Sequence, residues 1–81
     1  MYFLTPHAWE RMKERAISRK LIDLALQEPT EVMYDEKGRI LLKKLYVKNN
    51  KERLLLIVGE MVDGRLEIIT IIDTSKVRKY L

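Results

Sequence analysis

The sequence predicts an α+β fold in which an N-terminal helical hairpin packs on a four-stranded antiparallel β-sheet. Two capped apolar segments precede Pro29 and show helical spacing. After Thr30 the apolar residues follow the spacing of strands. Short turn motifs separate these later apolar runs, which indicates consecutive hairpins.

The two helices are predicted over residues 6–15 and 18–27. Thr5 has a hydroxyl that can cap the first helix, and Pro6 suits the first helical position because its missing N–H costs nothing there. Ser18 is the corresponding cap of the second helix.

The strands are predicted at about residues 31–35, 40–48, 52–61 and 66–74, within a single domain over residues 1–81. The third strand contains an unbroken apolar run, so it should be apolar on both faces and therefore central. Asp63-Gly64 is the strongest hairpin signal in the chain. Residues 2–4 form either a brief edge strand or an apolar staple onto the first helix.

A sheet that is apolar on both faces needs cover on both. The helical hairpin covers one face in this prediction. The other face meets either the C-terminal segment or a second copy of the chain, which leaves a homodimer open.

The composition restricts the class of protein. The chain has 81 residues, of which 47% are hydrophobic and 35% charged, as expected for one small folded domain. It has no cysteine and one histidine, so a zinc site and its usual ligands are not expected, and no cofactor is predicted. No apolar run is long enough to span a membrane, and no signal peptide is evident. These features predict a cytoplasmic protein without membrane contact.

The positive charge is unevenly placed along the chain. Between Lys37 and Arg53 there are seven cations and one acid, and the tail from Ser75 onward adds three cations. Such clustering is typical of a protein that binds a polyanion such as RNA. The alternative is a solvated sheet face with edge lysines that prevent aggregation.

The first helix carries two different stripes. At about 100° per residue, its histidine and two arginines, His7, Arg11 and Arg15, share one side. The roughly opposite side carries Trp9, Met12 and Ala16, of which Trp9 and Met12 are predicted to be core residues. We therefore expect the chemistry on the His7 side.

Several short motifs occur in a recognisable order: Thr5-Pro6-His7, Arg11 and Arg15, Ile17-Ser18, Pro29, Lys43-Lys44, Arg53-Leu54, Thr70, Thr74-Ser75-Lys76 and Lys79-Tyr80. In this order, and over essentially the whole chain, the sequence resembles the bacterial and archaeal family catalogued as domain of unknown function 4258. The resemblance implies a fold similar to RelE-like toxins and to barnase-like, EndoU-like and colicin-like ribonucleases. It also implies a metal-independent RNA-cleaving activity of the toxin type.

Carried over to this chain, the resemblance makes four residues the catalytic candidates: His7, Arg11, Arg53 and Thr70. His7 would take the proton of a 2′-hydroxyl, and the two arginines would hold the phosphate. The RNA-binding candidates are Arg15, Lys44, Ser75, Lys76 and Tyr80. With one histidine, the leaving group would be protonated by Lys76, by Tyr80 or by water.

Each candidate also has a structural interpretation. His7 can be a surface or capping residue, and Thr70 an ordinary strand residue. The helix arginines can pair with Glu10, Glu14 or Asp23. Lys43 and Lys44 point to opposite faces, so at most one of them can line the same groove.

Two alternatives to an enzyme follow. The first is a non-catalytic module that binds RNA or an acidic, antitoxin-like protein in the same basic groove. The second is a structural homodimer that pairs through the last strand.

Overall fold

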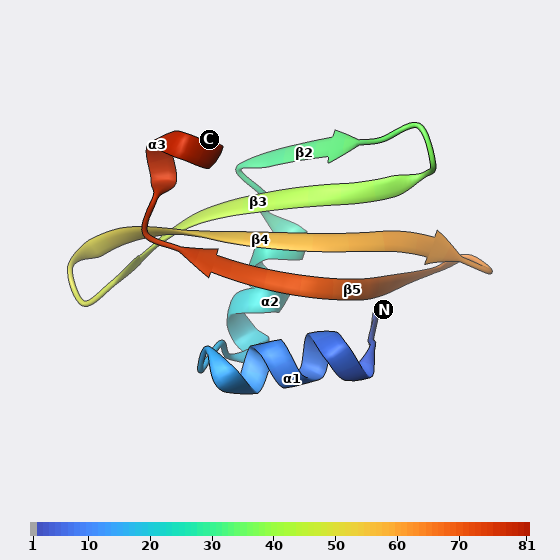
Figure 1. The fold of residues 1–81 in the computed structure, drawn as a ribbon, viewed down its shortest axis with the longest axis horizontal. Coiled ribbons are helices and arrows are strands. Elements are labelled where there is room, and N and C mark those ends of the chain that lie inside the picture. The colour runs from blue at the N-terminus through green and yellow to red at the C-terminus, as the bar shows by residue number, and fades with distance from the viewer. Residues whose placement is uncertain (1) are drawn as a thin grey trace.

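The computed structural model describes residues 2–81, which form a five-stranded mixed sheet with three helices (Figure 1). The strands lie side by side in the order β1-β5-β4-β3-β2. In chain order the elements are β1 (Tyr2–Leu4), α1 (Pro6–Glu14), α2 (Arg19–Gln27), β2 (Glu31–Tyr34), β3 (Arg39–Lys48), β4 (Lys51–Val62), β5 (Arg65–Thr74) and α3 (Val77–Tyr80).

The prediction of a four-stranded antiparallel sheet is wrong. Tyr2–Leu4 forms a fifth strand, β1, which pairs in parallel with β5, while the other neighbouring strands are antiparallel. The Thr5 N–H extends this pairing by donating to the Ile68 carbonyl, 3.1 Å away. Three residues are too few to show the alternation of a strand, so the sequence pattern does not reveal this strand. Its pairing with β5 follows from the position in which α1 packs on the sheet.

Both helices begin at the predicted caps. The Thr5 hydroxyl accepts from the Ala8 N–H at 3.2 Å, and the Ser18 hydroxyl accepts from the Leu21 N–H at 3.1 Å. Each bond satisfies a backbone donor that the first turn of a helix leaves without a partner.

Two-residue turns fix the registers of the two long hairpins. Asn49 and Asn50 have φ angles of 52° and 63°, and Asp63 and Gly64 have φ angles of 52° and 77°. Positive φ at both central residues is the turn geometry whose twist matches that of paired strands. β4 joins these hairpins and is the central strand of the sheet, as its unbroken apolar run predicts.

A β-bulge interrupts the β4–β5 ladder. Val58 pairs with Thr70 and Gly59 pairs with Ile68, so Ile69 has no partner on β4. Ile68 and Ile71 are therefore both buried in the same core although they stand three residues apart. In a regular strand that spacing would place them on opposite faces.

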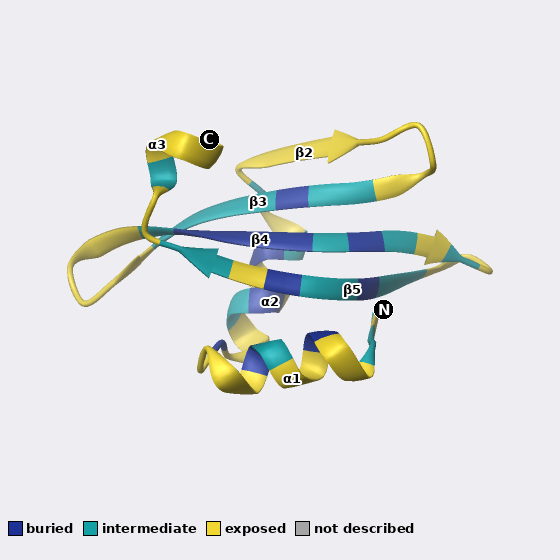
Figure 2. Cartoon of the chain, viewed as in Figure 1, coloured by how far each residue is buried: buried dark blue, intermediate teal, exposed yellow. Residues whose placement is uncertain are grey.

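The main core lies between the helices and one face of the sheet (Figure 2). Ala8 and Met12 face it from α1, with 0% and 8% of their surfaces exposed. The prediction that Trp9 is a core residue is wrong, because its side chain is 44% exposed. The small Ala8 side chain lets α1 lie close to the sheet. Ala16 is exposed because it follows the end of α1 in a left-handed conformation.

The second face of the sheet, the outer face, is covered only in part. Leu54 and Leu56 on β4 are buried there, where α3 contacts β4. The Lys43 ammonium, on the same face, donates to the Tyr80 carbonyl and so holds α3 in place. In the described residues 2–81, no helix is long and apolar enough to cross a membrane.

Candidate nucleic-acid interface

His7 and Thr70, two of the predicted catalytic residues, are in contact. The His7 Nε2 atom lies 3.1 Å from the Thr70 hydroxyl oxygen, so the two can share a hydrogen bond. His7 is exposed near the start of α1, and Thr70 lies beside the bulge of β5. Solvent and a ligand can therefore reach the imidazole.

Thr5 and the bulge together set this contact. Besides capping α1, the Thr5 hydroxyl donates to the Ile69 carbonyl at 3.1 Å. Ile69 is the residue that the bulge leaves unpaired on β4. The start of α1 is thus attached to the irregular part of β5, and His7 comes within reach of Thr70. Bulges commonly redirect a side chain in this way beside a functional site.

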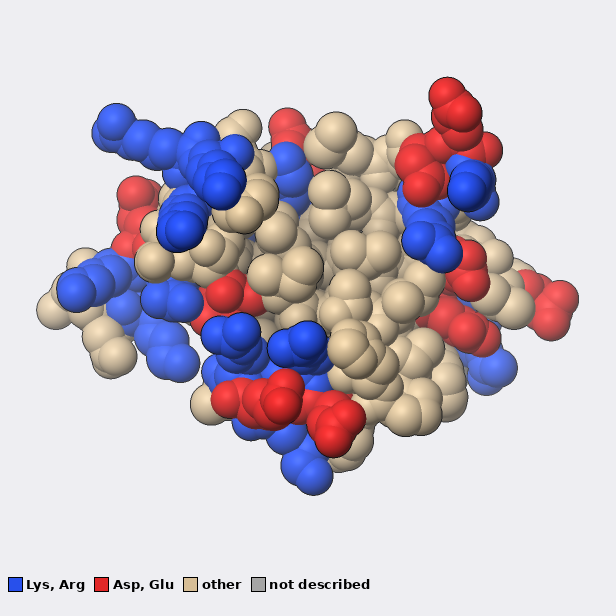
Figure 3. All heavy atoms as spheres, in the orientation of Figure 1, with Lys and Arg blue, Asp and Glu red and all other residues tan. Residues whose placement is uncertain are grey.

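A second cluster lies where the end of α1 approaches the β3–β4 hairpin. It surrounds a cavity of about 420 Å³, here called the basic pocket, which is lined by Arg15, Lys48, Asn49, Lys51, Arg53 and Asp73. Four of the six are cations and one is an acid. Figure 3 shows Lys and Arg side chains gathered over this hairpin and the neighbouring part of α1.

The ion pair between Arg53 and Asp73 forms the inner wall of the basic pocket, and the Tyr46 hydroxyl is hydrogen-bonded to it. The Arg53 Nε donates to both Asp73 oxygens at 3.1 and 3.2 Å, and its Nη2 lies 3.0 Å from Oδ2. The Tyr46 hydroxyl donates to Asp73 Oδ1 at 2.6 Å. The Asp73 side chain is only 7% exposed, whereas that of Arg53 is 28% exposed. Asp73 therefore fixes Arg53 in place while part of the guanidinium faces the pocket.

This arrangement alters the acid–base properties of its members. Burial, followed by the hydrogen bond to Asp73, raises the pKa of Tyr46 to about 12. The hydrogen bond to Asp73 is the main reason why the pKa of Arg53 is raised. The ion pair therefore keeps Arg53 in its charged form.

The predicted site residues fall into two clusters rather than one. Thr70 pairs with Val58 and Asp73 pairs with Leu55. Val58 and Leu55 are separated by an odd number of positions on β4, so their partners project to opposite faces. Thr70 and Asp73 also stand about 10 Å apart along the strand at about 3.3 Å per residue. The His7–Thr70 pair and the Arg53 cluster are therefore linked by α1, which carries His7 near its start and Arg15 after its end.

The remaining candidates lie elsewhere or are engaged in other contacts. Arg11 forms an exposed ion pair with Glu14 at 3.7 Å, one of the alternatives that the sequence left open. The Lys44 ammonium donates to the Glu28 carbonyl at 2.7 Å and so ties β3 to the end of α2. Ser75, Lys76 and Tyr80 belong to the β5–α3 turn and to the ends of α3, on the outer face.

The site residues named from the sequence do not include four residues of the basic pocket, Lys48, Asn49, Lys51 and Asp73, or Tyr46, which contacts Asp73. A signal existed for some of them. The two-residue turn at Asn49-Asn50 places Lys48 opposite Lys51 and Tyr46 opposite Arg53. No comparable signal reveals Asp73, because its position depends on the bulge.

No family model, no curated protein and no solved structure matches this chain with significant similarity. Within residues 2–81, the structure contains no group of three potential metal-binding side chains of the His, Cys, Asp and Glu types.

Proposed function

We propose that this protein binds RNA through its ribose–phosphate backbone at the basic pocket. The observation that carries the proposal is the direct pairing of Lys48 with Lys51 across the β3–β4 hairpin. Like charges directly opposite each other destabilise a sheet. Within the described residues, neither lysine forms an ion pair. An anion in the pocket would relieve this repulsion.

Arg53 and Arg15 extend the cationic surface from this lysine pair towards α1. Asp73 offsets only one of the four positive charges, and its carboxylate is turned towards Arg53 and Tyr46. The Arg53 atoms that contact Asp73 are Nε and Nη2, which leaves Nη1 to donate to a phosphate oxygen. A guanidinium that is already oriented loses little side-chain entropy on binding.

The test compares two exposed lysines near opposite ends of the β3–β4 hairpin, since Lys51 begins β4 opposite the end of β3. Lys51 lies in the basic pocket, whereas Lys37 lies in the turn before β3. β3 has ten residues, so its ends are about 30 Å apart. Binding of a fluorescent single-stranded RNA is measured by anisotropy between low and moderate salt for wild type, Lys51→Gln and Lys37→Gln.

Lys51→Gln should weaken binding several-fold and should lower the slope of log affinity against log salt by about 0.7, the value for one phosphate contact on a single strand. Lys37→Gln removes the same charge and should change neither quantity by a comparable amount. Equal effects of both variants would contradict a localised site. Absence of RNA binding would favour an acidic protein as the ligand of this pocket.

The His7–Thr70 contact favours cleavage of bound RNA as a second candidate function. In this reaction the 2′-oxygen attacks phosphorus and the bond to the 5′-oxygen breaks. The 2′-hydroxyl proton passes to His7 Nε2, and water protonates the departing 5′-oxygen. Thr70 would hold the imidazole in position until the substrate hydroxyl replaces it.

The experiment follows cleavage and binding of the same RNA in EDTA. His7→Gln can retain a hydrogen bond to Thr70 but cannot act as a base, so it should abolish cleavage and leave affinity nearly unchanged. Cleavage that persists in this variant would exclude His7 as the base. Binding without cleavage by wild type would leave the first function alone.

A further inference from the structure

We infer that the outer face of the sheet is an interface for a second copy of this chain, turned end to end. The outer faces of the two copies would pack against each other. The twofold axis would lie in the plane between them, perpendicular to the long axis of each molecule. This inference is independent of the proposed RNA site.

The middle of the outer face is apolar and open. Figure 3 looks onto this face and shows a broad uncharged area between its two ends. Ile72 and Met33 are 46% and 48% exposed there. Between them lie Leu41 and Val58, which pair across β3 and β4 and are only half-buried. α3 covers only the part of this face near Leu54 and Leu56.

One end of the face has an excess of acid. Glu60 and Glu67 lie directly opposite each other on β4 and β5, and Arg39 is the next residue in the same row. The adjoining turns add Asp35, Glu36 and Asp63 against Lys37 and Arg65. Within the described residues, neither Glu60 nor Glu67 forms an ion pair. Two carboxylates directly opposite each other repel, and Arg39 beside Glu60 can offset only one of the two charges.

The other end of the face is basic. It carries Lys76 just before α3 and Arg78 and Lys79 on α3, with Glu52 at the start of β4 as the nearby acid. Tyr80 at the end of α3 and the following Leu81 are 39% and 48% exposed. The charges at the two ends of the face are therefore of opposite sign.

A twofold axis perpendicular to the long axis satisfies both ends at once. It places α3 of each copy over the open acidic half of the other, so that the cations meet Glu60 and Glu67. A twofold axis along the long axis would instead bring like ends together. The whole molecule extends 39 by 25 Å in the plane of Figure 1, so the outer face offers at most about 1,000 Å², against the about 800 Å² per partner of a standard interface.

Charge reversal provides the decisive test. Sedimentation equilibrium should show that wild type, with a chain mass of 9.7 kDa, forms dimers. Arg78→Glu/Lys79→Glu and Glu60→Lys/Glu67→Lys should each raise the dimer dissociation constant at least tenfold. An equimolar mixture of the two variants should regain the wild-type dimer fraction, because every basic end then meets an acidic end again.

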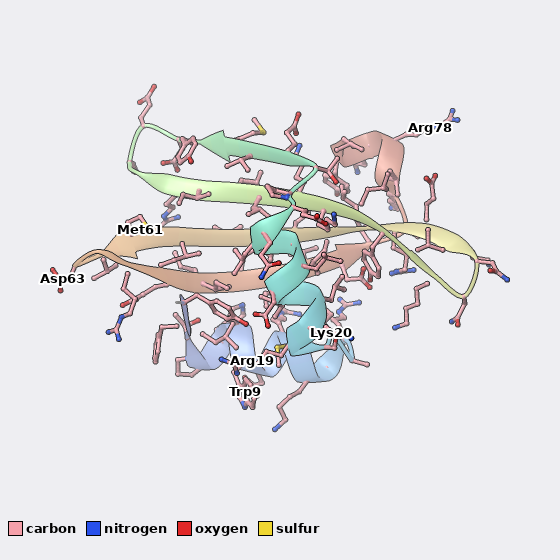
Figure 4. The ribbon with its side chains drawn as sticks, turned by 180° about the vertical axis from the view of Figure 1, so that it is seen from behind. Trp9, Arg19, Lys20, Met61, Asp63 and Arg78 are labelled. Carbon is pink, nitrogen blue, oxygen red and sulfur yellow. The ribbon has the colours of Figure 1, made fainter. Side chains whose placement is uncertain are left out.

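A matched pair of apolar positions separates this interface from a general loss of folding. Ile72 lies on the outer face. Met61, beside the Asp63 turn, is 56% exposed on the opposite face, because it pairs with Leu66, which packs against the main core (Figure 4). Ile72→Lys should prevent dimerisation and Met61→Lys should not. Thermal unfolding should show that both variants remain folded.

A monomeric wild type would overturn the inference, and so would a mixture of charge variants that fails to recover dimers. Neither result would affect RNA binding at the basic pocket, so the two proposals can fail separately. RNA binding that is weakened in Lys51→Gln while dimers persist would show the same separation.

Discussion

The Arg53 guanidinium grips the Asp73 carboxylate through two nitrogens, with Nε 3.1 Å from Oδ2 and Nη2 3.0 Å from the same oxygen. The two residues stand on adjacent strands, two positions out of direct register. The ion pair joins the neighbouring strands β4 and β5 and fixes the orientation of Arg53 in the basic pocket.

Asp73→Asn should destabilise the fold by about 2 kcal/mol. Removing one partner of a fully buried pair costs about 3–5 kcal/mol, and the partial exposure of Arg53 lets water compensate for some of that loss. Urea unfolding measures the change. The double variant Arg53→Gln/Asp73→Asn should lose less than the sum of the two single variants, because the interaction is removed only once. Strict additivity would show that the pair contributes nothing.

Tyr46 should make stability depend on alkaline pH. A tyrosine in the unfolded chain loses its proton near pH 10, whereas the pKa of Tyr46 in the folded protein is about 12. Between these values the unfolded state binds fewer protons, so the free energy of unfolding falls as the pH rises. The contribution is complete below about pH 10 and is lost by about pH 12.

Chemical unfolding at a series of pH values tests this expectation. The stability difference between wild type and Tyr46→Phe should shrink as the pH rises from about 10 to about 12. Tyr34→Phe, at a residue that is 74% exposed, is the matched control for loss of a phenol. A constant difference between wild type and Tyr46→Phe over this range would contradict the assignment.

Thr5→Val should cost about 2 kcal/mol, more than the loss of an ordinary cap. Its hydroxyl both accepts from the Ala8 N–H and donates to the Ile69 carbonyl. Valine keeps the shape but satisfies neither group. Ser18→Ala removes a cap that has one bond and should cost about 1 kcal/mol. Thermal and urea unfolding rank the two variants, and recovery in Thr5→Ser would confirm that the hydroxyl is responsible.

Gly59→Ala should lower the free energy of unfolding by about 2 kcal/mol. A Cβ built at Gly59 would lie 2.8 Å from the Glu67 carbonyl oxygen and 3.0 Å from a Leu66 methyl carbon. The carbonyl belongs to the paired strand beside the bulge and has little room to move. A variant as stable as wild type by urea unfolding would show that the β4–β5 ladder yields easily here.

Local sequence signals were sufficient where a feature depends on neighbouring residues. Thr5 and Ser18 cap their helices because a hydroxyl next to a helical segment can reach the first free N–H groups. The paired left-handed residues at Asn49-Asn50 and Asp63-Gly64 form tight turns for an equally local reason. The exposure of Trp9 and the parallel pairing of β1 could not be obtained in this way, because both depend on how closely α1 approaches β5.

The sequence by itself determined the helix caps, the hairpin turns and the central position of β4. Only the tertiary structure decided the bulge at Ile69, and with it the position of Asp73 beside Arg53 in the basic pocket. Counted from the Asp63-Gly64 turn without a bulge, Asp73 would pair with Leu54 on the outer face. The extra residue shifts it to Leu55, on the same face as Arg53 and Tyr46. A one-residue shift in register exchanges the two faces of a strand, and no local pattern within Ile68–Ile72 shows where the shift occurs.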